Sequence, residues 1–137
     1  DGYQTYELLK GSKNKSIIKL KSKIIETIAK TKDKAIQQQL EKNLSGWGVI
    51  LKQGGYQKKH THTDAEVSGV IYLEVPKEDE GRAANGCLMF SGYKKKIVKP
   101  KAGMIVIFPS YLPHETIPYN QDSERICIAF NATGKLS

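Results

Sequence analysis

The sequence predicts a mainly β fold with an N-terminal helix, an α+β arrangement, from three observations. About seven short apolar or β-branched segments follow Trp47, and Gly, Pro or charged turns separate them. One amphipathic segment of helical period precedes them. The chain has 137 residues, which is enough for one core and predicts one domain. Many short strands with close turns are typical of a sandwich, a barrel or a jelly roll.

The N-terminal third carries the helical signal. Residues 1–15 are polar and contain glycines, so we expect an arm or loop there. In residues 16–31, isoleucines and leucine recur at helical spacing and lysines occupy the other face, which predicts an amphipathic helix capped by Ser16. The segment from Asp33 to Leu44 has a weaker helical pattern and is expected to be a second helix or a loop.

The rest of the chain has the strand signal. We therefore expect residues 1–45 to form an N-terminal arm and helical support, and residues 46–137 to form the β core of a single domain. The expected strands are 47–51, 56–62, 67–75, 87–90, 95–98, 104–108 and 125–130.

The chain is basic, with a net charge of +8 from 22 Lys and Arg against 14 Asp and Glu. Only Arg82 and Arg125 are arginines, although nucleic-acid sites favour the bidentate arginine fork. The charge therefore indicates a solvated lysine-rich surface and argues against a nucleic-acid partner. No apolar run approaches the roughly 20 residues of a membrane span.

Two cysteines, Cys87 and Cys127, lie in apolar stretches. Two cysteines do not make a disulfide framework, so we expect buried free thiols in a reducing compartment, the cytoplasm.

The three histidines of the chain predict a metal site. His60, His62 and Asp64 share one parity, so on a strand their side chains would point to one face. His114 follows about fifty residues later, in a turn that contains Pro113 and comes after another predicted strand. Two histidines and a carboxylate are the ligand set expected of non-haem Fe(II) oxygenases.

Two ligand sets remain open from the spacing. One is His62, Asp64 and His114; the other is His60, His62 and His114, with Asp64 as a turn residue. The second set, followed by Glu66, is similar to the first cupin motif. Three of these four residues are expected to bind the metal, and His60, if it is not a ligand, could orient one by hydrogen bonding.

Arg125 is the candidate for an anion site. It lies among apolar neighbours on a predicted strand, where a guanidinium needs an anionic partner or exposure. A dicarboxylate cosubstrate that reaches from the metal would supply that partner through a bidentate contact. The alternative is a surface ion pair with Glu124 or Asp122.

These residues resemble the 2-oxoglutarate/Fe(II)-dependent dioxygenase superfamily, and more narrowly a group of small bacterial and phage domains. The matching stretches are 2–5, 54–62, 67–72, 108–114 and 124–131. The resemblance implies a double-stranded β-helix, the cupin-like jelly roll, with Fe(II) near His62 and His114. It also implies that Arg125 binds the distal carboxylate of 2-oxoglutarate and that Tyr56 contacts the same cosubstrate.

Two residues depart from the pattern of this group. Thr63 stands where the group usually has Pro, which keeps the choice of ligand set open. Cys127 stands where a small residue such as Ser is common, so a hydroxyl is missing from the implied cosubstrate pocket.

The leading interpretation is a hydroxylase that uses O2 and couples oxidative decarboxylation of 2-oxoglutarate to oxidation of an unknown small-molecule or peptide substrate. A second is a cupin-like metal protein that does not use 2-oxoglutarate, and a third is a basic binding domain that uses Lys94 to Lys96. Tyr111, Tyr119 and Trp47 could line a substrate pocket, although we expect Trp47 to pack in the core.

Overall fold

The computed structural model describes residues 2–31, 37–52, 57–60, 65–75, 87–91, 95–117 and 124–133. Their strands form two antiparallel sheets: a five-stranded sheet in the order β1-β2-β9-β4-β7 and a four-stranded sheet in the order β3-β8-β5-β6. The strands are β1 (Gly2–Glu7), β2 (Leu44–Leu51), β3 (Gln57–His60), β4 (Val67–Glu74), β5 (Leu88–Ser91), β6 (Lys95–Val98), β7 (Ile105–Pro109), β8 (His114–Thr116) and β9 (Arg125–Ala132).

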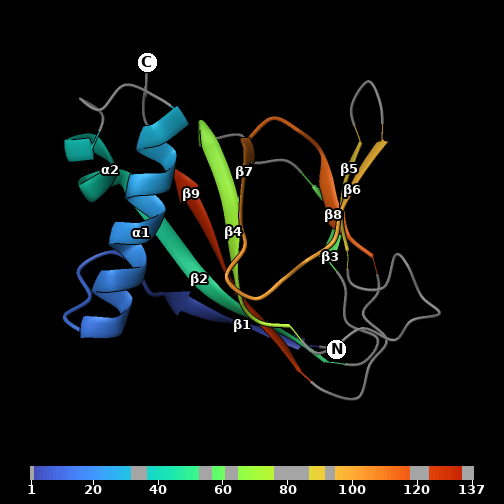
Figure 1. The fold of residues 1–137 in the computed structure, drawn as a ribbon, viewed down its shortest axis with the longest axis horizontal. Coiled ribbons are helices and arrows are strands. Elements are labelled where there is room, and N and C mark those ends of the chain that lie inside the picture. The colour runs from blue at the N-terminus through green and yellow to red at the C-terminus, as the bar shows by residue number, and fades with distance from the viewer. Residues whose placement is uncertain are drawn as a thin grey trace.

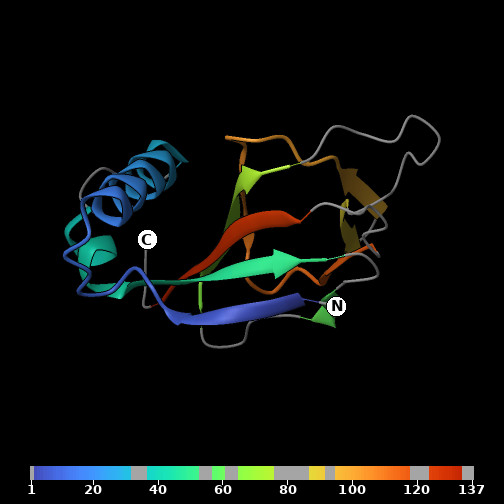
Figure 2. The ribbon, with the colours of Figure 1, turned by 90° about the horizontal axis from the view of Figure 1, so that it is seen from below.

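The layers run from helices to the large sheet to the small sheet, as Figures 1 and 2 show. The chain changes sheet between consecutive strands, for example from β4 to β5 and from β7 to β8. This is the jelly-roll arrangement that the sequence predicts, so the expected fold class is confirmed. All seven expected strands are present, with ends shifted by up to three residues.

Helix α1 (Lys15–Thr31) forms because its apolar residues recur on one side. Ile24, Ile25 and Ile28 are buried, and the cluster that they join also contains Leu40 of α2 (Gln37–Asn43). Ser16 is not the cap. The Asn14 carboxamide oxygen accepts hydrogen bonds from the backbone N–H groups of Ser16 and Ile17, at 2.9 and 3.2 Å, as an N-cap side chain does.

The expectation of a loop over residues 1–15 is wrong for Gly2–Glu7, which form β1. Hydrogen bonds from residues far along the chain hold this strand in place, although its local sequence does not predict a strand. The Gly48 N–H donates to Thr5 Oγ1 at 2.8 Å, and the Gly46 and Leu9 N–H groups both donate to the Glu7 carboxylate at 2.9 Å. These bonds fix β1 against β2 although its residues 4–7 are exposed.

The large sheet has a different cluster of buried residues on each face. Toward α1 and α2, the cluster includes Leu44, Val67, Ile71, Ile128 and Phe130. Toward the small sheet, the cluster includes Val49, Val70, Tyr72, Phe108 and Cys127. Strand alternation divides the two sets, because successive side chains point to opposite faces.

The two thiols are buried and free, as expected. Neither α1 nor α2 combines the length and the apolar character that a membrane-crossing helix requires.

Candidate active-site cavity

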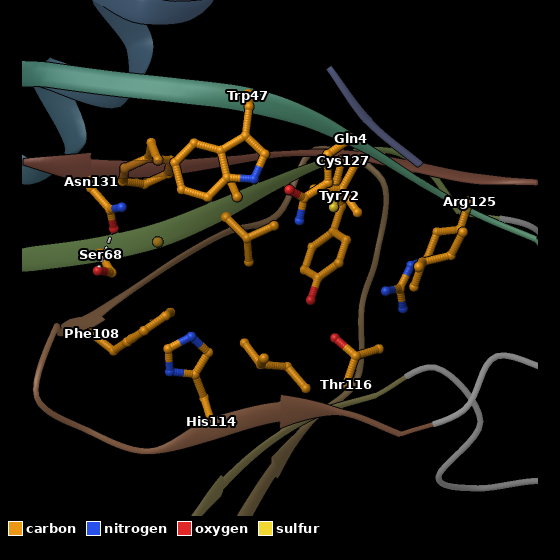
Figure 3. A pocket seen from close by; sticks show the side chains of 17 residues that line it. Gln4, Trp47, Ser68, Tyr72, Phe108, His114, Thr116, Arg125, Cys127 and Asn131 are labelled. Atoms are coloured by element: carbon orange, nitrogen blue, oxygen red, sulfur yellow. Dashed lines mark hydrogen bonds between the residues drawn. The ribbon is translucent and has the colours of Figure 1, made fainter. Parts of the chain in front are cut away.

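A cavity of about 380 Å³ lies between the two sheets. Alternate residues of the central strands form one wall, and β8 forms the other (Figure 3). The polar residues that line it are Gln4, Ser68, Tyr72, His114, Thr116, Arg125 and Asn131.

His114 is the first residue of β8 and only 5% exposed. The sequence places it in a turn after Pro113, but it pairs with Phe90 of β5 in the small sheet. Its Nδ1 lies 2.9 Å from the Leu112 carbonyl oxygen. A carbonyl only accepts, so Nδ1 carries the proton and the basic lone pair is on Nε2. This is the tautomer in which a metal-binding histidine is typically held by a backbone carbonyl.

Phe108 packs beside the imidazole, with 4.5 Å between the ring centroids. Phe90 lies 4.9 Å from Phe108 in an edge-to-face contact. The two rings restrict the orientation of His114 and form an apolar wall next to it.

The other predicted metal ligands are only in part within the described residues. The backbone of His60 lies on β3, where His60 is the register partner of His114. His62 and Asp64 lie outside the described residues, as does Tyr56. Within the described ranges, no three His, Cys, Asp or Glu side chains gather as a metal site.

Arg125 begins β9 and lines the cavity, 3% exposed. Its guanidinium carbon lies 5.5 Å from the centre of the Tyr72 ring. The alternative of a surface ion pair with Glu124 is wrong, because Arg125 is buried and the Glu124 carboxylate lies 3.9 Å from Lys52 Nζ instead. Asp122 lies outside the described residues.

Tyr72 and Thr116 are two site residues that sequence reasoning missed. Their hydroxyls point into the same part of the cavity as the Arg125 guanidinium (Figure 3). Burial raises the pKa of Tyr72 far above its ordinary value, and the nearby Arg125 charge opposes this only in part. The phenol therefore stays protonated at neutral pH and can donate a hydrogen bond to an anion.

The opposite end of the cavity holds Trp47, Ser68 and Asn131. Trp47 packs against the cavity-side cluster, as the core expectation requires, and it also lines the cavity. Tyr111 is 76% exposed and is not among the residues that line the cavity, whereas Tyr119 lies outside the described residues.

A jelly roll whose cavity holds a histidine and a buried arginine is the arrangement of the 2-oxoglutarate/Fe(II)-dependent oxygenases, a class of oxidoreductases. The family described as "Putative 2OG-Fe(II) oxygenase" matches residues 45–131. The chain belongs to this family, whose name implies Fe(II) and 2-oxoglutarate as cofactors. No curated protein sequence matches the chain.

Solved structures share the fold at low sequence identity. A prolyl-4-hydroxylase of Pseudomonas putida matches with a TM-score of 0.73 and 18% identity over 98% of this chain and 73% of that one. A prolyl hydroxylase of Trichoplax adhaerens, in complex with a hypoxia inducible factor peptide, matches with a TM-score of 0.67 and 19% identity over 93% of this chain and 61% of that one. A 2OG-Fe(II) family oxidoreductase of Burkholderia pseudomallei matches with a TM-score of 0.58 and 14% identity over 68% of this chain and 45% of that one.

Proposed function

We propose that this protein is an Fe(II)- and 2-oxoglutarate-dependent dioxygenase that hydroxylates an organic substrate. One observation carries the proposal: His114, in the tautomer that suits a metal ligand, and the buried Arg125 line one cavity. In the proposed reaction, one oxygen atom of O2 enters the new hydroxyl and the other enters succinate, which forms with CO2 from 2-oxoglutarate.

The proposed metal ligands are His114, His62 and either Asp64 or His60. Neutral imidazole and carboxylate oxygen are donors that suit Fe(II). The register pairing of His60 with His114 supports this group, because it places β3, which ends at His60, next to β8. When bound there, Fe(II) supplies the activation of O2 and the oxidation of a C–H bond.

The chain's own residues position the cosubstrate. Arg125 binds the distal carboxylate of 2-oxoglutarate through its planar fork, and a buried guanidinium is suited to such a bidentate contact. The Tyr72 and Thr116 hydroxyls, on the same side of the cavity, donate to that carboxylate. The apolar side chains of Leu51 and Leu88, which are the register partners of Arg125 and Thr116, keep water from this part of the cavity.

The test measures succinate release from 2-oxoglutarate by the Fe(II)-loaded protein, with alanine variants of the four candidate ligands. We expect His114→Ala and His62→Ala to abolish both Fe(II) binding and succinate release. The third ligand is identified by whichever of Asp64→Ala and His60→Ala does the same.

A protein that binds Fe(II) but neither binds nor decarboxylates 2-oxoglutarate would contradict the proposal and favour the cupin-like alternative. The substrate is proposed to be a peptide or a small molecule. The peptide held by the Trichoplax protein supports the inclusion of peptides among the first substrates tested.

A further inference from the structure

A chain of three buried or half-buried polar side chains crosses the large sheet beside the cavity. The Ser68 hydroxyl donates to Asn131 Oδ1 at 2.6 Å, and Ser68 Oγ lies 2.8 Å from Ser110 Oγ. A hydroxyl has one proton, so Ser110 must be the donor in the second bond. Both serines are 1% exposed. These two hydrogen bonds fix the Asn131 carboxamide with its oxygen toward Ser68.

The nitrogen of that carboxamide is consequently turned away from Ser68 and lies on the cavity side in Figure 3. Its surroundings are apolar: Trp47, Val70 and Ala129 line the same stretch of wall. Among the described residues, no second hydrogen bond to the Asn131 side chain occurs. A donor that faces such a wall gains from an acceptor, because a ligand that covers it without accepting a hydrogen bond leaves it unsatisfied.

Trp47 adds a second observation of the same kind. Its indole Nε1 is buried and has no hydrogen-bond partner within the described ranges. At this end of the cavity, the described wall residues therefore offer the Asn131 N–H groups and an aromatic face, and none of them is charged.

Asn131 lies at the other end of the cavity from Arg125. The two residues are six positions apart on β9, which corresponds to about 20 Å along a strand and exceeds the length of a five-carbon diacid. Ser68 is the register partner of both Asn131 and Phe108, and Phe108 contacts His114. Asn131 is thus placed near His114 but out of reach of a cosubstrate anchored at Arg125.

We propose that Asn131, oriented by Ser68 and Ser110, binds a carbonyl oxygen of an apolar substrate group that packs against Trp47. This inference rests on the proposed function for the identity of the ligand at Arg125. It makes Asn131 a specificity-determining residue, because a substrate group of the same shape without the oxygen leaves the Nδ2 donors unsatisfied.

The experiment uses two probes of equal shape, cyclopentanone and methylenecyclopentane, which differ in having C=O or C=CH2. Their binding to the Zn(II)-loaded protein is titrated by ligand-observed NMR, with and without 2-oxoglutarate. We expect the wild-type protein to bind the ketone about five- to tenfold more tightly, as one net hydrogen bond allows.

Asn131→Asp is the decisive variant, because it keeps the acceptor for Ser68 and removes the N–H donors. We expect the ketone preference to disappear in it, and to fall in part in Ser68→Ala, where the carboxamide loses its orientation. Thr116→Val is the matched control at the Arg125 end: it is expected to weaken 2-oxoglutarate binding and leave the ketone preference unchanged. Urea unfolding of each variant verifies that it is folded.

Equal affinities for the two probes in the wild-type protein, or no binding of either, would overturn the role of Asn131. A ketone preference that persists in Asn131→Asp would do the same. Failure of 2-oxoglutarate to bind, with the probe results intact, would overturn the proposed function and leave the carbonyl site standing.

Discussion

The two faces of strand β9 carry residues with different roles: one face packs under the helices, and the other lines the cavity. Ile128 and Phe130 belong to the cluster under α1 and α2, and Phe130 also borders the cavity. Arg125, Cys127 and Asn131 line the cavity. Neighbouring residues therefore serve different purposes, because alternation sends them to opposite sides of the sheet.

Strand β4 repeats the division. Val67 and Ile71 pack toward the helices, whereas Ser68 and Tyr72 line the cavity. The cavity face carries polar side chains among an apolar cluster of its own, whereas the cluster on the helix face consists of apolar side chains. This difference predicts that substitutions on the two faces have separable effects.

The largest expected effect is the loss of stability when a residue on the helix face is replaced. Ile128→Ala is expected to lower the free energy of unfolding by about 2–5 kcal/mol, because it leaves a cavity in the cluster beneath α1. Urea unfolding measures the loss, and the folded fraction should keep its affinity for 2-oxoglutarate. Cys127→Ala, one residue away on the other face, is the matched control. A larger stability loss for Cys127→Ala than for Ile128→Ala would contradict the larger contribution of the helix face to stability.

The next effect is the pH dependence of stability from the cavity face. Burial raises the pKa of Cys127 from its ordinary value of 9.0 to about 11, although the Arg125 charge opposes the shift. The folded protein then holds this proton more tightly than the unfolded chain does. The resulting stability is complete below pH 9 and is lost as the pH rises to 11, at up to about 1.4 kcal/mol per pH unit.

Thermal or urea unfolding between pH 8 and pH 11 checks this prediction by comparing the wild-type protein with Cys127→Ala. The variant should show the shallower decline. Burial also raises the pKa values of Cys87 and Tyr72, so the difference between the two proteins, rather than either curve, isolates Cys127. Parallel curves would show that Cys127 titrates as it does in the unfolded chain.

The smallest expected effect tests whether the Tyr72 hydroxyl belongs to the proposed carboxylate site. Tyr72→Phe removes one hydroxyl from the proposed carboxylate site and keeps the ring under Arg125. We expect the affinity for 2-oxoglutarate to fall by about two- to tenfold, the value of one net hydrogen bond. Calorimetric titration of the metal-loaded protein measures it. An unchanged affinity would remove Tyr72 from the cosubstrate site and leave Arg125 in it.

Local sequence was enough to predict the helix at residues 16–31 and all seven expected strands, because their period and β-branched residues are strong signals. It was not enough for β1, whose polar residues are fixed by Gly46 and Gly48, some forty positions away. Strand β8 has three residues directly after Pro113, and the proline favoured a turn.

The candidate site shows the same limit. The sequence indicates His114 because it is one of only three histidines, and Arg125 because a guanidinium is unusual among apolar neighbours. Tyr72 has only a strand signal in the local sequence, because its place beside Arg125 follows from its register with Cys127 on β9. Ser68 and Asn131 are 63 residues apart, so nothing in the local sequence of either residue indicates their hydrogen bond.

The central claim is that this cavity holds 2-oxoglutarate between His114 and Arg125. The most direct measurement is an anaerobic titration of the Fe(II)-loaded protein with 2-oxoglutarate, followed by the weak visible charge-transfer band of the chelate. We expect the band to appear in the wild-type protein and in Glu124→Gln, whose exposed carboxylate pairs with Lys52, and to require about a hundredfold more 2-oxoglutarate in Arg125→Gln. No band in protein that binds Fe(II), or equal affinities in the wild-type and Arg125→Gln proteins, would contradict the claim.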